Sequence, residues 1–317
     1  MSMRILITGG AGCLGGNLIE HFYPAMHEFL VLDNFATGRR EVVDGIPRVQ
    51  VVDGSVYDHQ LVDSVFDEFQ PTHVIHSAAA YKDPRNWKED AQTNVTGTII
   101  VAEAAIRHKV KRFVNFQTAL CYGRPESVPI PVTHVQRPFT SYGISKTAGE
   151  QYLLSLASEE MEVVSLRLAN VTGPRLAIGP IPTFYQRLKE GKSCFCSETV
   201  RDFLDMSDFL ALMDKVLVAG APTGVFNVST GQGNSIKDIF DAVVAYLGIQ
   251  LDEPVKVVPP GDDDVPAVVL DPAETERAFG WKAQVGFEQT IHRMLSWYDH
   301  HGISAIYSHL ASPTSDK

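Results

Sequence analysis

Short runs rich in Val and Ile alternate with longer amphipathic stretches through the first half of the chain, and this alternation is the feature that most limits its fold. The runs cover residues 5–8, 29–33, 49–52, 73–77, 112–117 and 163–167, and helical stretches cover 17–22, 61–69, 93–108 and 142–158. Continuous apolar strands separated by helices predict a parallel sheet that is buried on both faces. We therefore expect an α/β fold built on a doubly wound sheet of the Rossmann type.

The alternation breaks after Arg167, where a stretch rich in Pro and Gly predicts that the chain leaves the sheet. A strand-like run at 225–228 predicts a return, so a second, smaller α/β domain would be discontinuous. We expect a sheet domain at 1–170 and about 205–232, and a smaller domain at about 171–204 and 233–310 that includes a helix at 287–301. Residues 311–317 are expected to form a flexible tail.

Charge and composition exclude several classes of protein. The net charge of −11 leaves no basic face for a nucleic acid or an anionic membrane. No apolar run is long enough to span a bilayer, and the chain starts without the pattern of a signal peptide. The four cysteines are scattered, and no second pair at ligand spacing follows Cys194 and Cys196. We expect a cytoplasmic protein without a metal site.

A glycine-rich turn, TGGAGCLG at residues 8–15, joins the first predicted strand to the first predicted helix. Gly9 permits a tight turn, Gly12 lets the backbone approach a pyrophosphate, and Gly15 lets the helix pack against the strand. The positive end of the helix then faces the phosphates. The turn predicts that the sheet domain binds a dinucleotide.

An acidic residue, Asp33, ends the second predicted strand 18 residues after Gly15. A carboxylate at this position accepts hydrogen bonds from the adenine ribose hydroxyls and repels a 2′-phosphate. Arg39 and Arg40 follow and could serve NADP, but the carboxylate at the strand end outweighs flexible arginines beyond it. The predicted cofactor is NAD.

Tyr142 and Lys146 begin a predicted helix at a spacing of four residues, which places both side chains on one face. At an effective dielectric of about 20, an ammonium about 4 Å away would favour the phenolate by about 4 kcal/mol, or roughly 3 pK units. The phenol would then act as a base near neutral pH. Thr118 adds a hydroxyl at the end of the fifth strand, so we expect three polar groups to converge there.

Six segments together resemble the extended short-chain dehydrogenase/reductases, and most of all their NAD-dependent sugar-nucleotide epimerase/dehydratase branch, which includes UDP-glucose 4-epimerase-like enzymes. Besides the glycine turn and the Tyr-x-x-x-Lys pair, these are HSAA at 76–79, NVTGT at 94–98, RLANVTGP at 167–174 and RDF at 201–203. The resemblance implies that Thr118 is the catalytic hydroxyl and Tyr142 the base. It implies that Lys146 tunes that base and holds the nicotinamide ribose.

The same resemblance implies two sets of binding residues. Substrate contacts are expected from Thr118, Tyr142, Asn170, Arg201 and Val268, with Asn170 and Arg201 on the diphosphate, where the planar fork of Arg matches phosphate. Residues expected to line the NAD site are Gly9, Gly12, Cys13, Leu14, Gly15, Asp33, Asn34, Thr37, Gly38, Ser55, Val56, Ser77, Ala78, Ala79, Tyr81, Asn94, Tyr142, Lys146 and Leu168.

The residues after Thr118 separate the branches of this family. Dehydratases resemble one another in placing an Asp-Glu pair there, and decarboxylases keep an acid at the second position. Here these positions are Ala119 and Leu120, and neither side chain can move a proton. What remains is oxidation and reduction at one carbon, and an NAD-dependent epimerase that inverts C4 of a UDP-hexose or UDP-N-acetylhexosamine through a keto intermediate is the leading hypothesis.

Three positions depart from the family pattern. Gly261 stands where an Arg usually grips phosphate, with acids at 262–264 beside it. Val268 stands where enzymes restricted to hexoses carry a bulky Tyr, which predicts room for an N-acetyl group. Ser55 replaces the acid that commonly meets the adenine amine, which should weaken NAD binding only modestly.

Two other functions stay open at this point. One is a dehydratase of the same branch, and the other is a catalytically silent protein that only binds or senses a dinucleotide. Members of the family usually dimerise through two helices per subunit, and residues 101–108 and 152–157 would form that contact in a homodimer by resemblance.

Overall fold

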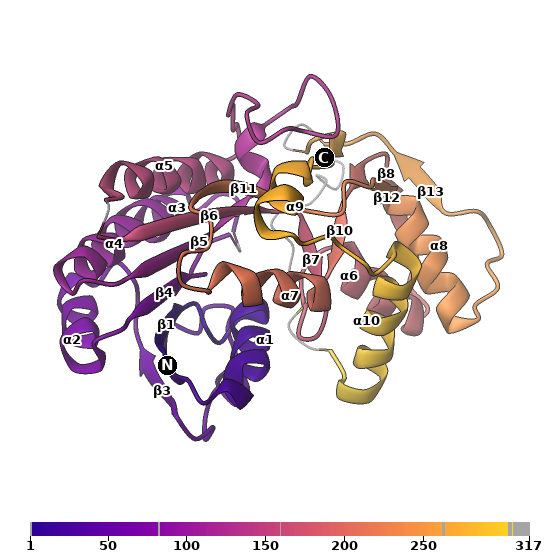
Figure 1. Ribbon diagram of the computed structural model, residues 1–317. Helices are drawn as coiled ribbons and strands as arrows, with labels where there is room; N and C mark the ends of the chain where they lie inside the picture. Colours follow the sequence, from indigo (N-terminus) through magenta and orange to yellow (C-terminus); the bar gives the residue numbers. More distant parts are fainter. Residues whose placement is uncertain (1, 82, 159, 262–263, 304–305, 307–317) are drawn as a thin grey trace.

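The computed structural model describes residues 2–81, 83–158, 160–261, 264–303 and 306. Its centre is a seven-stranded, entirely parallel sheet with the strand order β11-β6-β5-β4-β1-β2-β3 (Figure 1). The strands are β1 (Arg4–Thr8), β2 (Glu28–Asp33), β3 (Val49–Asp53), β4 (His73–His76), β5 (Arg112–Thr118), β6 (Glu162–Leu168) and β11 (Gly224–Val228). The predicted doubly wound sheet is confirmed, including the return of the chain at β11.

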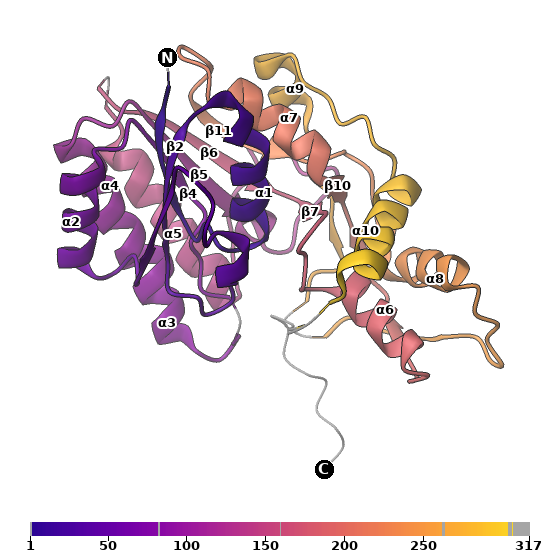
Figure 2. The same ribbon diagram turned by 90° about the horizontal axis from the view of Figure 1, so that it is seen from below.

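Helices cover both faces of this sheet (Figures 1 and 2). The helices α2 (His59–Phe69), α4 (Thr98–Arg107) and α5 (Ser141–Leu156) lie on one face, and α1 (Cys13–Phe22), α7 (Met206–Val216) and α9 (Ala273–Phe279) lie on the other. Alternate side chains of a strand point to opposite faces. Leu6 therefore packs under α2 and α4, whereas Ile5 and Ile7 pack under α1 and α7.

Some helices differ from the predicted ranges at their ends. The first helix, α1, starts at Cys13 because Gly12 already serves as its N-cap. The helix predicted at 93–108 is two consecutive elements, the π-helix η3 (Gln92–Gly97) and α4, and a short helix that was not predicted, α3 (Trp87–Ala91), directly precedes them. The helix α5 starts at Ser141 because the Thr140 hydroxyl accepts a hydrogen bond from the Gly143 amide. Short 3-10 helices occur at η1 (Tyr23–Ala25), η2 (Arg40–Val42) and η4 (Ala119–Tyr122).

The chain between and after these elements forms a second group of helices and short strands, beside the sheet (Figure 2). The helices α6 (Pro180–Lys189), α8 (Ile236–Leu247) and α10 (Phe287–His301) share one hydrophobic cluster. Around them the strand pairs are β7 (Asn170–Thr172) with β10 (Phe203–Asp205), β8 (Phe195–Ser197) with β13 (Lys256–Val258), and β9 (Val200–Arg201) with both β12 (Asn234–Ser235) and β14 (Ala267–Val268).

Of these helices, only α10 was predicted, and its bounds are as expected. Pro180 stands in the first turn of α6, where a missing amide costs nothing, so a proline that suggested loop marks a helix start instead. None of the helices in the described ranges is long and apolar enough to cross a membrane. The division into two domains remains a prediction, and the predicted tail at 311–317 lies outside the described residues.

Candidate functional site

At two positions of the glycine-rich turn, nearby backbone atoms leave no space for a side chain. Gly9 has a φ of +65°, and a Cβ added to it would lie 2.8 Å from the Ala78 Cα. A Cβ on Gly15 would lie 2.4 Å from the Gly10 Cα. The first turn of α1 carries no acid, so its amides and the positive end of its dipole can meet an anion. This geometry fits the pyrophosphate of a dinucleotide.

Asp33 lies buried at the end of β2 and accepts hydrogen bonds from the amides of Ala11, at 2.9 Å, and Phe35, at 2.8 Å. A carboxylate has about four acceptor positions, so oxygen lone pairs remain for two ribose hydroxyls. Burial raises the pKa of Asp33. Arg39 and Arg40 pair with Glu41 and Asp53, so both guanidinium groups are already engaged with carboxylates. These contacts favour NAD over NADP.

Ser55 supplies a further sign of a bound group. Its hydroxyl is buried, and it has no hydrogen-bond partner among the residues that the structure describes. Leaving a buried hydroxyl without a partner costs about 1–3 kcal/mol. A ligand amine beside it would satisfy that oxygen, which fits the predicted position of the adenine.

The other residues expected to contact NAD follow the carboxyl ends of the sheet strands or lie on the helices beside them. Asn94, in η3, holds the loop after β4 through two 2.9 Å hydrogen bonds, from the Ala80 amide and to the Ala80 carbonyl. Residues after strand ends are Asn34, Thr37, Gly38, Val56, Ser77, Ala78, Ala79 and Tyr81, while Leu168 ends β6, and Cys13 and Leu14 start α1. The structure thus gathers the predicted set at one edge of the sheet, where ligands of such folds bind.

The three predicted catalytic residues come from neighbouring elements at this same edge. Thr118 is the last residue of β5, and its hydroxyl oxygen caps η4 by accepting a hydrogen bond from the Leu120 amide at 3.1 Å. Tyr142 and Lys146 occupy the first two turns of α5. A Cβ added to Gly143 would lie 3.0 Å from the Leu120 carbonyl, so the start of α5 packs against the turn that follows Thr118.

The pKa of Tyr142 differs from the expectation. Lys146 was expected to lower it, but burial raises it, and the Tyr81 and Asp90 side chains raise it further. Burial also lowers the pKa of Lys146 to about 8, against the opposing charge of Glu150. Burial is the main cause of both shifts because desolvation disfavours the charged form of each side chain.

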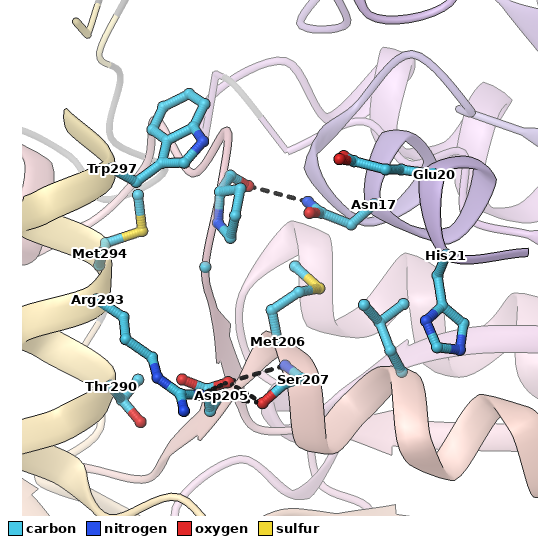
Figure 3. Close-up of a pocket in the computed structure, with 13 residues that line it drawn as sticks. Asn17, Glu20, His21, Asp205, Met206, Ser207, Thr290, Arg293, Met294 and Trp297 are labelled. Carbon is cyan, nitrogen blue, oxygen red and sulfur yellow. Dashed lines mark hydrogen bonds and ion pairs between the residues drawn. The ribbon is translucent and has the colours of Figure 1, made fainter. Parts of the chain in front are cut away.

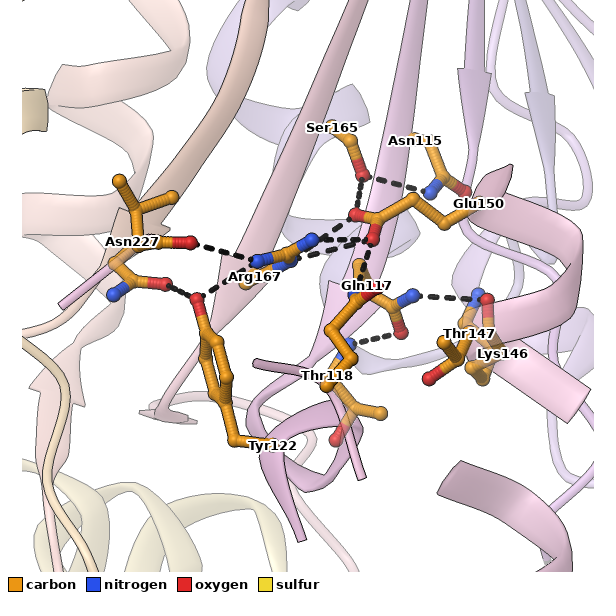
Figure 4. A network of polar contacts seen from close by, with 12 residues as sticks. Asn115, Gln117, Thr118, Tyr122, Lys146, Thr147, Glu150, Ser165, Arg167 and Asn227 are labelled. Atoms are coloured by element: carbon orange, nitrogen blue, oxygen red, sulfur yellow. Dashed lines mark hydrogen bonds and ion pairs between the residues drawn. The ribbon is translucent and has the colours of Figure 1, made fainter. Parts of the chain in front are cut away.

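Gln117 is a buried residue that the sequence analysis did not single out, and it links two of the catalytic positions (Figure 4). Its side-chain oxygen accepts from the Thr118 amide at 2.7 Å, and its amide nitrogen donates to the Lys146 carbonyl at 2.9 Å. The side chain therefore fixes the end of β5 relative to α5. Its position before Thr118 was visible in the sequence, but its partner on α5 was not.

A buried ion pair lies behind this link (Figure 4). Arg167 of β6 and Glu150 of α5 are 2.7 Å apart, and their side chains are only 8% and 1% exposed. Arg167 also donates to the Tyr122 hydroxyl at 2.9 Å, which in turn donates to Asn227 of β11 at 2.7 Å. The network joins β6, α5, η4 and β11, so it supports the elements that carry Thr118, Tyr142 and Lys146.

The other predicted substrate contacts, besides Thr118 and Tyr142, lie on β7, β9 and β14. Asn170 is exposed and donates to the Asp202 carbonyl at 3.0 Å. Arg201 forms an ion pair with Asp264. The guanidinium that was expected to bind the diphosphate is therefore paired with a carboxylate of the chain in this structure. Val268 pairs with Arg201 and is only 5% exposed, in an apolar cluster with Ala119. Residues 262 and 263, the other two acids, lie outside the described ranges.

Two reactive side chains near the site, Cys121 and His76, are buried in the core. Cys121 is fully buried in the cluster around Ala119. His76 is enclosed between the hydroxyls of Thr8, at 2.8 Å, and Thr98, at 3.0 Å, and burial lowers its pKa to about 3, so it stays neutral. In the described part of the chain, no group of three or more His, Cys, Asp or Glu side chains is suited to a metal ion.

A separate cavity of about 390 Å³ opens between α1, α7 and α10 (Figure 3). Met206, Arg293, Met294 and Trp297 line it, and Arg293 is held by Asp205 at 3.3 Å. None of the predicted site residues lines this cavity. It is therefore distinct from the edge of the sheet where the predicted residues gather.

Known proteins are similar to this chain over most of its length. The family model described as "NAD dependent epimerase/dehydratase family" matches residues 5–229. The crystal structure of the Bordetella bronchiseptica enzyme WbmG with NAD and UDP is 65% identical, has a TM-score of 0.93, and is matched over 99% of this chain and 100% of that one. The B. bronchiseptica enzyme WbmH with NAD+ is 37% identical over 96% of this chain and 100% of that one, with a TM-score of 0.88. A UDP-glucose 4-epimerase of Lacticaseibacillus casei is 28% identical over 94% of this chain and 98% of its own length.

Proposed function

This chain belongs to the NAD-dependent epimerase/dehydratase family, and from that premise we propose that it is an NAD-dependent epimerase of nucleotide sugars, inverting C4 of a UDP-hexose or UDP-N-acetylhexosamine. One observation carries the choice of reaction. The turn after Thr118 presents Ala119, which is buried in an apolar cluster, and Leu120, which packs against that cluster, so no acid or base stands where a dehydratase needs one. A curated relative is a UDP-glucose 4-epimerase, and the similar WbmG was solved with NAD and UDP, which supports both the reaction and the nucleotide.

The residues of the chain fit NAD, which when bound would accept a hydride from the sugar carbon and return it. In this proposal the turn at residues 8–15 holds the pyrophosphate, Asp33 the adenine ribose, and Ser55 the adenine side of the site. Binding by backbone amides and one carboxylate orients the cofactor without a metal.

In the proposed mechanism, Tyr142 removes the proton from the sugar hydroxyl and later restores it. The Thr118 hydroxyl shares the same sugar oxygen, and the ammonium of Lys146 stabilises the phenolate. Loss of hydride leaves a ketone, and its return to the opposite face inverts the carbon. Both half-reactions use the same three groups, which are the ones that the fold brings to this edge.

The function is tested by incubating the NAD-loaded protein with UDP-glucose and UDP-N-acetylglucosamine and separating the products by chromatography. A C4 epimer supports the proposal. A product lighter by one water would identify a dehydratase, and unchanged substrate together with bound NAD would identify a dinucleotide-binding protein without catalysis.

Val268 and its apolar surroundings bear on which sugar the substrate carries. By resemblance, Val268 stands where enzymes restricted to hexoses carry a bulky Tyr, and its neighbours in the cluster with Ala119 are apolar, so we expect kcat/KM for UDP-N-acetylglucosamine to be at least comparable with that for UDP-glucose. Steady-state kinetics with both sugars provide the comparison. Turnover of UDP-glucose alone would contradict the assignment of Val268.

The lowered pKa of Lys146 predicts how activity depends on pH. A lysine is charged below its pKa, and its charge stabilises the phenolate, whose fraction still grows with pH in this range because the pKa of Tyr142 is raised. We therefore expect kcat/KM to rise with pH up to about 8 and then to level off, since the loss of the lysine charge offsets the growing phenolate fraction. The control is Lys146→Arg, whose guanidinium keeps its charge throughout the range. Whatever activity this variant retains should continue to rise above pH 8, and a plateau at the same pH would assign it to another group.

We also propose that the protein is a cytoplasmic homodimer. All four cysteines are free thiols, as a reducing compartment favours.

On the two helices expected to form the dimer contact, Ile106 of α4 is 37% exposed and Tyr152 of α5 is 53% exposed, whereas Val101 of α4 is buried against the sheet. Light scattering should give the mass of two chains, and Ile106→Asp with Tyr152→Asp should give that of one. A monomeric parent protein would refute the dimer.

A further inference from the structure

The carboxylate of Asp90 is buried close to the proposed catalytic tyrosine, with a single hydrogen-bond partner among the residues that the structure describes. Asp90 lies in α3 and is only 2% exposed. It accepts one hydrogen bond, from the Ser141 hydroxyl at 2.6 Å, and no basic side chain in the described ranges forms an ion pair with it. Burying a charge without a counter-ion costs several kcal/mol, so an acid at this position destabilises the fold unless it has a further role.

The contact belongs to a regular pattern between two helical segments. Asp90 holds Ser141, and Asn94, four residues later, donates to the Ser145 hydroxyl at 3.0 Å. Ser141 and Ser145 are themselves four residues apart on α5. Each immediately precedes a proposed catalytic residue, Tyr142 or Lys146. The α3–η3 segment is therefore attached to α5 at two points, one beside each catalytic side chain.

Resting on the function proposed above, we propose that Asp90 is a positioning residue: through Ser141 it fixes the first turn of α5, and its negative charge keeps the Tyr142 phenol a strong base. The charge adds to the effect of burial, which is the main cause of the raised pKa of Tyr142. Among the described residues, the titratable groups that act on Tyr142 or Asp90 are Tyr81, with its ring 5.8 Å from that of Tyr142, Asp83 and Glu89, and Lys146 follows Tyr142 one turn later on α5.

The direction of the charge effect follows from these neighbours. Tyr81 and Asp90 both raise the pKa of Tyr142, since a nearby negative charge disfavours a phenolate. Burial raises the pKa of Asp90 itself, and the hydrogen bond from Ser141 favours its charged form. Removing the charge while keeping the shape should therefore make Tyr142 easier to deprotonate.

The test uses the NAD-loaded protein and the variants Asp90→Asn, which keeps a hydrogen-bond acceptor without charge, and Asp90→Ser, which is smaller and also uncharged. Ultraviolet difference spectra give the titration of Tyr142 after subtraction of the Tyr142→Phe spectrum, and they need no substrate. We expect either variant to lower the Tyr142 pKa by about half to one unit, as the loss of one partly screened charge would.

Ser141→Ala is the matched control, because it removes the contact and leaves the charge. It should lower kcat several-fold without lowering the Tyr142 pKa. An unshifted titration in both Asp90 variants would overturn the proposal, and so would an equal downward shift in Ser141→Ala. A shifted titration in a protein without epimerase activity would uphold the role of Asp90 and refute the proposed function instead.

Discussion

Replacing Tyr142 by Phe should abolish epimerase activity while leaving NAD bound. The substitution removes one oxygen, the only atom in the proposed mechanism that exchanges a proton with the sugar hydroxyl. General acid–base groups contribute about 10²- to 10⁴-fold to rate, so we expect kcat to fall by at least about 100-fold. Activity is measured with the better UDP-sugar, and NAD binding by calorimetry or by the cofactor retained after gel filtration.

Tyr152→Phe is the matched control for this experiment. Tyr152 lies on the same helix, ten residues further on, and is 53% exposed, so loss of its hydroxyl should change kcat little. Full turnover by Tyr142→Phe would sink the proposed mechanism. Loss of NAD along with activity would instead show that the phenol holds the cofactor in place.

Replacing Arg167 by Met should destabilise the protein more than the loss of any exposed ion pair. Glu150 is 1% exposed, and without Arg167 its charge would be buried without a cation. Breaking a buried pair from one side costs about 3–5 kcal/mol. The expected loss should appear as a lower free energy of unfolding in denaturant titrations.

Two further variants separate charge from packing at this site. Lys237→Met breaks an exposed pair with Asp241 on α8 and should cost no more than about 0.5 kcal/mol. The double variant Arg167→Met with Glu150→Gln removes both charges and should recover part of the loss, because no uncompensated charge remains. If Arg167→Met matches Lys237→Met in stability, the buried pair has no special role.

The sequence predicted the sheet because its strands are short, apolar and separated by helices, which are local properties of the chain. It also predicted the glycine turn, since Gly9 and Gly15 are required by close backbone contacts that no other residue permits. It did not predict α6 or α8. A proline usually interrupts a helix, but in the first turn of α6 it is compatible with one. Whether the stretch rich in Pro and Gly forms a helix there depends on packing against α10, which the sequence does not show.

For the candidate site, too, some features were predictable from the sequence and others were not. Thr118, Tyr142 and Lys146 were identified by spacing and by their place after a strand, and the fold brings their elements together. The sequence could not show that Gln117 reaches the Lys146 carbonyl, or that Asp90 reaches Ser141, because these partners lie 29 and 51 residues away. Such contacts depend on how α3 and α5 pack, which no local pattern records.

What the sequence by itself determined is therefore the fold class, which follows from periodicity and glycine geometry, and it also supplied the candidate catalytic groups through short spacings and a family resemblance. What only the tertiary structure decided is the electrostatic state of those groups. Spacing alone predicted that Lys146 lowers the pKa of Tyr142, whereas burial and the nearby Asp90 raise it. The reason is physical: charge attraction follows from distance along a helix, but desolvation follows from everything that packs around it.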